Sequence, residues 1–145
     1  MTENFSLTRY IVVSALCGFL FAILDGLIHA NPFAQGLYVF YRPIARASVN
    51  APAGMVIDLV YGFVITGAFL ILFNSLPGNS GPVRGASFAV FLWFLRVVMG
   101  VAGAWMTLNI PMKVHVYELL AGFGEMLAIG LLLGFAYQGQ TAASR

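Results

Sequence analysis

The fold is decided by the stretch LTRYIVVSALCGFLFAILDGLIHA, residues 7–30, which is apolar over most of its length. A helix that spans a membrane needs about 20 consecutive apolar residues, and this run supplies them. Arg9 lies near its beginning, and Asp25 and His29 interrupt its end. Because Glu3 precedes the run and these two polar residues lie inside it, we interpret it as a retained membrane helix and not as a signal peptide.

The composition extends this interpretation to the whole chain of 145 residues, which is 61% hydrophobic and 8% charged. A soluble domain carries about 25% charged residues. A core of this size cannot bury so much apolar surface, so we expect an integral membrane protein. A net charge of +2 without a basic cluster argues against a nucleic-acid partner. The only cysteine, Cys17, excludes a disulfide within the chain and a cysteine-based metal site.

Three further apolar segments follow, each bounded by Pro, Gly or Asn. Together with residues 7–30 they predict helices at about 52–73, 83–108 and 112–137. Their lengths and their Leu, Ala and Gly content argue against membrane-spanning strands. The sequence therefore predicts one multi-pass membrane domain, residues 1–145, with an all-α fold: a four-helix transmembrane bundle.

The longest connection, residues 31–51, is rich in aromatic and basic residues. We expect a short interfacial helix there, with Tyr38, Phe40 and Tyr41 at the level of the lipid headgroups and Arg42 and Arg46 outside it.

Two short segments repeat each other along the chain. DLVYGF, residues 58–63, matches ELLAGF, residues 118–123. This echo predicts two tandem helical hairpins related by a pseudo-twofold axis along the membrane normal.

The basic residues that could orient the bundle are divided equally between its two sides: Arg9, Arg84 and Arg145 against Arg42, Arg46 and Lys113. An even number of helices places both termini on one side. We expect a bacterial inner-membrane protein with both termini in the cytoplasm.

Ionisable residues are concentrated inside the predicted helices, although charge is costly there. Four of the five acidic residues and both histidines lie in or at the ends of helices, and Arg96 is the one basic residue well inside a span. The topology brings most of them to one leaflet, with Glu125 about 10 Å deeper. The predicted site consists of Asp25, His29, Asp58, His115, Glu118 and Glu125, with Arg96 as counter-ion.

Helical spacing places these groups on stripes of small residues. Gly18 shares a face with Asp25, Gly122 with Glu125, and Gly100 with Arg96. Membrane helices approach each other along such stripes, so we expect them to face the interior. Phenylalanines should face lipid or a partner, among them Phe19, Phe69, Phe88, Phe91 and Phe94.

An ionised side chain at the bilayer centre costs at least ~2.5–3.5 kcal/mol, so four carboxylates facing one arginine need compensation. Three solutions exist: some carboxylates are protonated, a metal cation binds among them, or water enters from the near surface. Local pairing is the simpler alternative for each group, with Asp25 against His29 and Glu125 against Arg96. Asp58 lies near the start of its helix, where the helix dipole favours a carboxylate. His115 has a simpler explanation as a residue at the membrane interface.

The oxygen and nitrogen ligand set favours Mn, Fe or Zn if the cation is a metal, in the manner of four-helix carboxylate proteins. A haem held by His29 and His115 is a weaker alternative, because four carboxylates would line it. No nucleophile or cofactor motif is recognisable, so an enzymatic activity stays open.

The chain resembles a loose group of small bacterial four-helix membrane proteins without an assigned activity. The resemblance rests on DGLIH (25–29), GLYVFYRP (36–43), GPVRGASFAV (81–90) and ELLAGFGEMLAIGLLLG (118–134), and it implies the fold and topology. From the residues themselves we expect a membrane protein that binds a cation, either a metal ion or exchangeable protons. The alternative is a non-catalytic accessory or assembly subunit of a larger membrane protein complex. The partners that we expect are membrane lipids and either such a complex or a second copy of the chain.

Overall fold

The computed structural model describes residues 6–138 and contains only helices and their connections in that range. Four helical segments are long and apolar enough to cross a membrane, which confirms the all-α bundle and the multi-pass membrane topology. These spans are α1 (Leu7–Ala30), α3 (Ala51–Leu72), the combined segment Gly81–Thr107, and α6 (Met112–Ala136). The predicted boundaries differ from these by no more than two residues.

Polar caps and prolines set the ends of the helices. The Ser6 hydroxyl accepts a hydrogen bond from the Arg9 amide at 3.3 Å and begins α1. Asn31 ends α1, and its side chain accepts from the Ala34 amide at 2.9 Å to begin the short helix α2 (Pro32–Leu37). Asn50 caps α3 in the same way, through the Ala53 amide. These caps satisfy backbone donors that no intrahelical carbonyl can reach.

The third span is not the continuous α-helix that the sequence predicted for residues 83–108. It consists of α4 (Gly81–Leu92), a π-helical segment η2 (Trp93–Val98) and α5 (Met99–Thr107). The π segment contains Arg96, and the Trp93 indole at its start donates to the Leu119 carbonyl of α6 at 2.9 Å. Single π turns inside α-helices occur frequently at functional sites.

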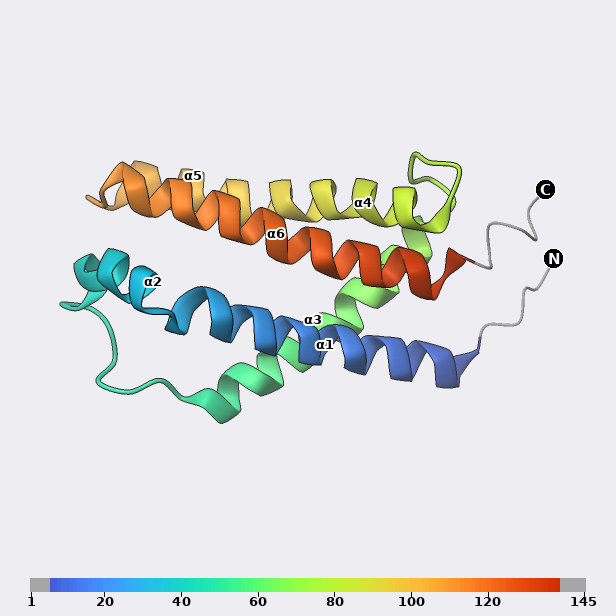
Figure 1. Ribbon diagram of the computed structural model, residues 1–145, viewed down its shortest axis with the longest axis horizontal. Coiled ribbons are helices and arrows are strands. Elements are labelled where there is room, and N and C mark those ends of the chain that lie inside the picture. The colour runs from blue at the N-terminus through green and yellow to red at the C-terminus, as the bar shows by residue number, and fades with distance from the viewer. Residues whose placement is uncertain (1–5, 139–145) are drawn as a thin grey trace.

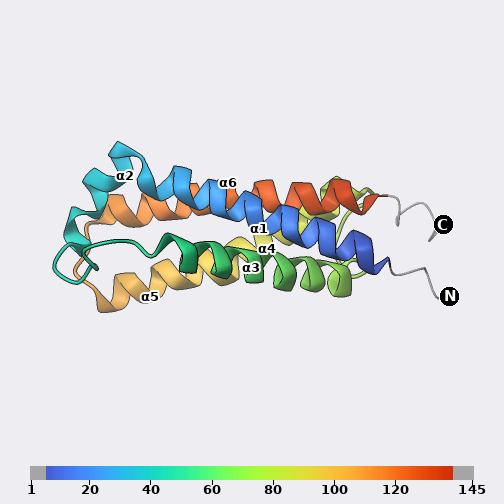
Figure 2. The same ribbon diagram turned by 90° about the horizontal axis from the view of Figure 1, so that it is seen from below.

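The helices pack as two antiparallel pairs, α1 with α3 and α4 with α6, and the pairs meet mainly through α1 and α6 (Figures 1 and 2). In the first pair, a Cβ on Gly62 would press on the backbone of Ser14 and Gly18. In the second, Gly85 and Gly130 touch through their backbones. The two tandem hairpins are thus present. The pseudo-twofold stays a prediction, because the echo partner of Gly62, Gly122, packs on the Val97 side chain.

Aromatic side chains fill the core at the end of the bundle where the termini lie. Phe69 contacts Phe88 at 5.2 Å and Phe73 at 5.4 Å between ring centroids, and Tyr137 at 6.1 Å. The prediction that Phe69 and Phe88 face outward is wrong, since both are fully buried. They lie where α3 and α4 face the junction of the two helix pairs.

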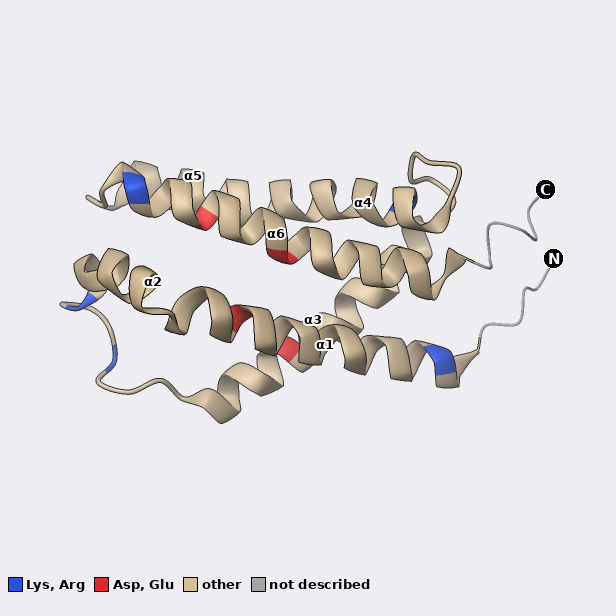
Figure 3. Cartoon of the chain, viewed as in Figure 1, with Lys and Arg blue, Asp and Glu red and all other residues tan. Residues whose placement is uncertain are grey.

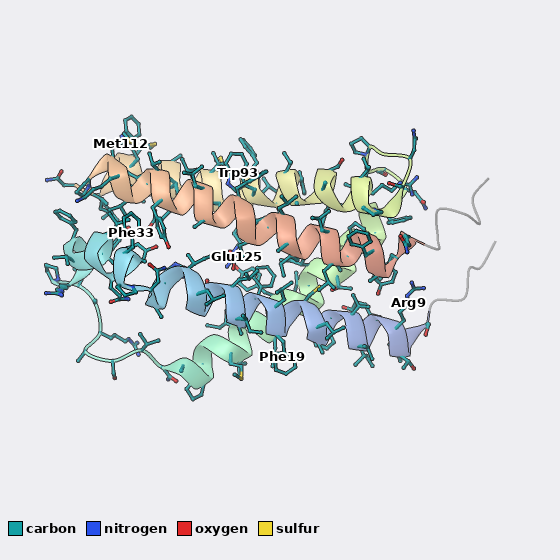
Figure 4. The ribbon with its side chains drawn as sticks, viewed as in Figure 1. Arg9, Phe19, Phe33, Trp93, Met112 and Glu125 are labelled. Atoms are coloured by element: carbon teal, nitrogen blue, oxygen red, sulfur yellow. The ribbon has the colours of Figure 1, made fainter. Side chains whose placement is uncertain are left out.

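The other three phenylalanines of that prediction, Phe19, Phe91 and Phe94, are about half exposed. Figure 4 shows Phe19 pointing away from the bundle.

The opposite end is packed more loosely. No residue of α5 is buried, and a Cβ on Gly100 or Gly103 would meet nothing within 4 Å. The small-residue stripe of the third span is therefore not a helix contact, unlike Gly18 of α1 and Gly122 of α6. The connection 31–51 contributes α2 and a 3-10 turn, η1 (Tyr38–Tyr41), at this end.

Candidate functional site

A cleft of about 330 Å³ opens at the loosely packed end, between α1, η1, α6 and the region of η2 and α5. Five of the seven predicted site residues line it: Asp25, His29, Arg96, Glu118 and Glu125. Figure 3 shows the acidic positions of the described chain gathered from the middle of the bundle toward α2. Three carboxylates face one guanidinium in the cleft, so negative charge is in excess.

The floor of the cleft is an ion pair between η2 and α6. Arg96 Nη1 lies 3.3 Å from Glu125 Oε2, and the Glu125 side chain is only 7% exposed. The Arg96 guanidinium lies over the rings of Phe21 and Tyr61, at 5.0 and 4.8 Å from their centroids. Aromatic faces attract a cation, so Arg96 is fixed from three directions.

The second carboxylate oxygen of Glu125 has no such partner. Oε1 is buried and makes no hydrogen bond to any described residue. Figure 4 shows Glu125 in the space between α6 and α1. A buried carboxylate oxygen without a donor is uncommon, because most buried polar atoms are hydrogen-bonded.

The α1 wall carries the local pair that helical spacing predicted. His29 Nδ1 lies 3.4 Å from the Asp25 carboxylate and 3.0 Å from the Asp25 carbonyl oxygen. The imidazole also stacks on the Tyr38 ring, with centroids 5.6 Å apart and planes inclined by 16°.

Two tyrosines of η1 complete the cleft, and the sequence reasoning did not assign them to the site. The Tyr41 hydroxyl donates to Glu118 Oε1 at 3.3 Å, whereas the Tyr38 hydroxyl is buried without a partner in the described structure. Burial and the nearby Glu118 carboxylate raise the pKa of both phenols above the ordinary value. Both hydroxyls therefore stay protonated at neutral pH. Their spacing of three residues, in the connection that follows the first predicted helix, was the available signal.

Further hydrogen bonds hold this end of α1 against α6. The Tyr117 hydroxyl donates to the Ile28 carbonyl at 2.7 Å and accepts from Asn31 Nδ2 at 3.1 Å. Gln35 of α2 donates to the His29 carbonyl at 2.7 Å. These contacts fix the position of η1 over the cleft.

Asp58 and His115 lie outside the cleft. Asp58 is buried on α3, behind α1, and the charges that act on it are those of Asp25 and Arg96. His115 is 2% exposed and lines a separate, largely apolar cavity of about 260 Å³ between α5 and α6. Its Nδ1 lies 3.8 Å from Glu118 Oε2, and neither ring nitrogen has a hydrogen-bond partner among residues 6–138.

This placement bears on the metal and haem hypotheses. Within residues 6–138, no three His, Cys, Asp or Glu side chains gather closely enough to hold a metal ion. His29 and His115 line different cavities, so the structure does not bring together the two ligands of a bis-histidine haem.

Comparisons with known proteins add no relative. No family model matches the chain, and no curated protein or solved structure matches it either.

Proposed function

We propose that the cleft is an intramembrane cation-binding site in which Glu125 either takes up a proton or pairs with a bound cation. The observation that carries this proposal is the Glu125 carboxylate itself. It is almost fully buried, and Arg96 engages one oxygen while the other has no donor. The charges that act on it include those of Asp25 and Asp58, so a single arginine cannot neutralise the cluster.

The arrangement favours proton exchange over a metal ion. The carboxylates are dispersed along the cleft, and a metal requires several ligands at short distance. The exposed fraction of the acidic side chains falls from 43% at Asp25 to 24% at Glu118 and 7% at Glu125. A proton can therefore pass from the outer carboxylates to the inner one.

Infrared difference spectroscopy tests this proposal directly. The full chain, purified in detergent, is compared in acidic and alkaline buffer. We expect a protonated-carboxyl band that disappears in Glu125→Gln. Asp58→Asn is the matched control, because Asp58 is another buried acid that does not line the cleft.

Two results would overturn the proposal: the absence of any titrating carboxyl band, or a band that is lost in Asp58→Asn but kept in Glu125→Gln. Metal analysis of the same sample tests whether a metal ion occupies the site. Stoichiometric Mn, Fe or Zn would assign the site to a metal ion instead of protons.

The accessory-subunit hypothesis is favoured by one observation, the unburied helix α5. Trp105 and Met106 are 61% and 75% exposed there, and Gly103 leaves open space beside them. A partner helix could approach closely at that glycine. Under this hypothesis, gentle detergent extraction recovers the chain in a large assembly, and recovery only as a free monomer or homodimer contradicts it.

We also propose that the site lies in a bacterial inner membrane, with both termini facing the cytoplasm. The even number of candidate spans supports the placement of the termini on one side.

A further inference from the structure

We infer that the cation bound by this cleft is a small primary ammonium ion with an apolar body. The inference rests on the proposed function and adds the chemical class of the ligand. It starts from what the cleft lacks, from its aromatic faces and from its size.

Two polar oxygens that line the cleft have no hydrogen-bond partner. Glu125 Oε1 and the Tyr38 hydroxyl oxygen are both buried, line the cleft and have no partner in the described structure. A proton on Glu125 neutralises its charge but fills none of the cleft. An ammonium group carries three N–H donors and a positive charge, and so supplies both needs at once.

Aromatic side chains line the same space, and His29 covers one face of the Tyr38 ring. The rings of Tyr38 and Tyr41 lie 5.9 Å apart with an angle of 59° between them. Tyrosine rings attract an organic cation placed over their faces. The Tyr41 hydroxyl donates a hydrogen bond to Glu118 and holds this carboxylate at the rim of the cleft. There its charge can attract the cation.

The remaining lining suits an organic body. Ile28, Val101 and Ala104 contribute apolar lining to the cleft beside its acidic groups. The volume of about 330 Å³ lies at the lower end of the range for small-molecule sites. A bare metal ion would leave this volume and this apolar lining unused.

Binding should also displace the proton from Glu125. When the ammonium ion pairs with the carboxylate, the proton leaves to solvent and the positive charge at the site is conserved. The ligand and the proton therefore compete, and the affinity for the ammonium ion should rise with pH until the amine itself deprotonates.

The test uses the full chain in detergent, calorimetric titration and four probes: n-butylammonium, tetramethylammonium, n-butanol and Zn²⁺. We expect saturable binding of n-butylammonium and at least about tenfold weaker binding of tetramethylammonium, which has no N–H donor. Butanol lacks the charge and should not bind measurably. The protonated Glu125 infrared band should decrease as n-butylammonium is added.

Two tyrosine variants locate the site. Tyr38→Phe removes an acceptor in the cleft and should weaken n-butylammonium binding about tenfold. Tyr137→Phe is the matched control, because its hydroxyl is also buried without a partner but lies beyond the end of α6, outside the cleft. The affinity of this control should equal that of the unmodified chain.

The outcomes separate this inference from the proposed function. Equal affinity for n-butylammonium and tetramethylammonium, equal effects of the two tyrosine variants, or binding of Zn²⁺ alone would overturn the inference. If no ammonium ion binds while the Glu125 band still titrates, the inference fails and the proposed function stands. If the band itself is absent, the proposed function fails.

Discussion

Arg96 is the residue whose position carries the most information about this chain. It pairs with Glu125 of α6 and lies over two aromatic rings from α1 and α3, and so connects the third span with the other three at one point. Sequence reasoning predicted its pairing with Glu125 from matching depth. The aromatic contacts could not be predicted, because they depend on how the two helix pairs rotate against each other.

The Arg96–Glu125 pair can be tested by a double-mutant cycle. Arg96→Leu leaves Glu125 without its counter-charge and should destabilise the fold by ~3–5 kcal/mol if that charge stays ionised. Arg96→Leu combined with Glu125→Leu removes both charges and should restore much of the loss. Unfolding of the three variants in detergent measures the coupling. A double variant whose loss of stability equals the sum of the two single-variant losses would show that the pair contributes no coupling energy.

Helix α6 shows how far helical spacing predicts a site. The prediction placed His115 on one face with Glu118 and Glu125. Ten residues at 3.6 per turn leave His115 about 80° around the helix from Glu125. This rotation is large enough to place His115 between α5 and α6 while Glu118 and Glu125 line the cleft. Residues that helical spacing placed on one face of α6 therefore contact two different surroundings, the cleft and the space beside α5.

The π segment illustrates a second limit at this scale. The apolar run and the caps predicted where the third span begins and ends, but nothing local signals the change at Trp93. That change coincides with a contact between distant parts of the chain, the Trp93 indole on the Leu119 carbonyl. The periodicity of the sequence cannot predict a contact between residues so far apart in the chain.

Glycine packing gives a prediction for the elements α4 and α6. A Cβ at Gly130 would press on the backbone of Gly85, whereas a Cβ at Gly124 on the same helix meets nothing within 4 Å. Gly130→Ala should therefore destabilise the bundle by about 1–3 kcal/mol. Gly124→Ala should be neutral or stabilise it by up to about 1 kcal/mol. Thermal unfolding of both variants in detergent compares them, and equal midpoints would contradict the close α4–α6 contact.

At the scale of the whole molecule, the two ends of the bundle are built differently. Near the termini, glycine backbones touch, aromatic rings fill the core, and the Arg9 guanidinium donates to the Ala136 carbonyl. At the α2 end, the α5 ribbon lies apart from α6 in Figure 2 and no residue of α5 is buried. The cleft lies at this end. The sequence indicated the four spans and the leaflet in which the ionisable groups gather, because both follow from length and topology. It did not indicate that one end is tight and the other loose, because that depends on side-chain packing between distant segments.

The tight end makes the bundle a vestibule and not a tunnel. Phe69, Phe88 and Tyr137 pack together in the core at the end of the bundle where the termini lie, so under the proposed function cations would reach Glu125 from the α2 end. A difference in acidity across the membrane would then register only through the compartment that the vestibule faces. Under the proposed function, transport of an ion across the membrane would require the packed aromatic core at the tight end to open.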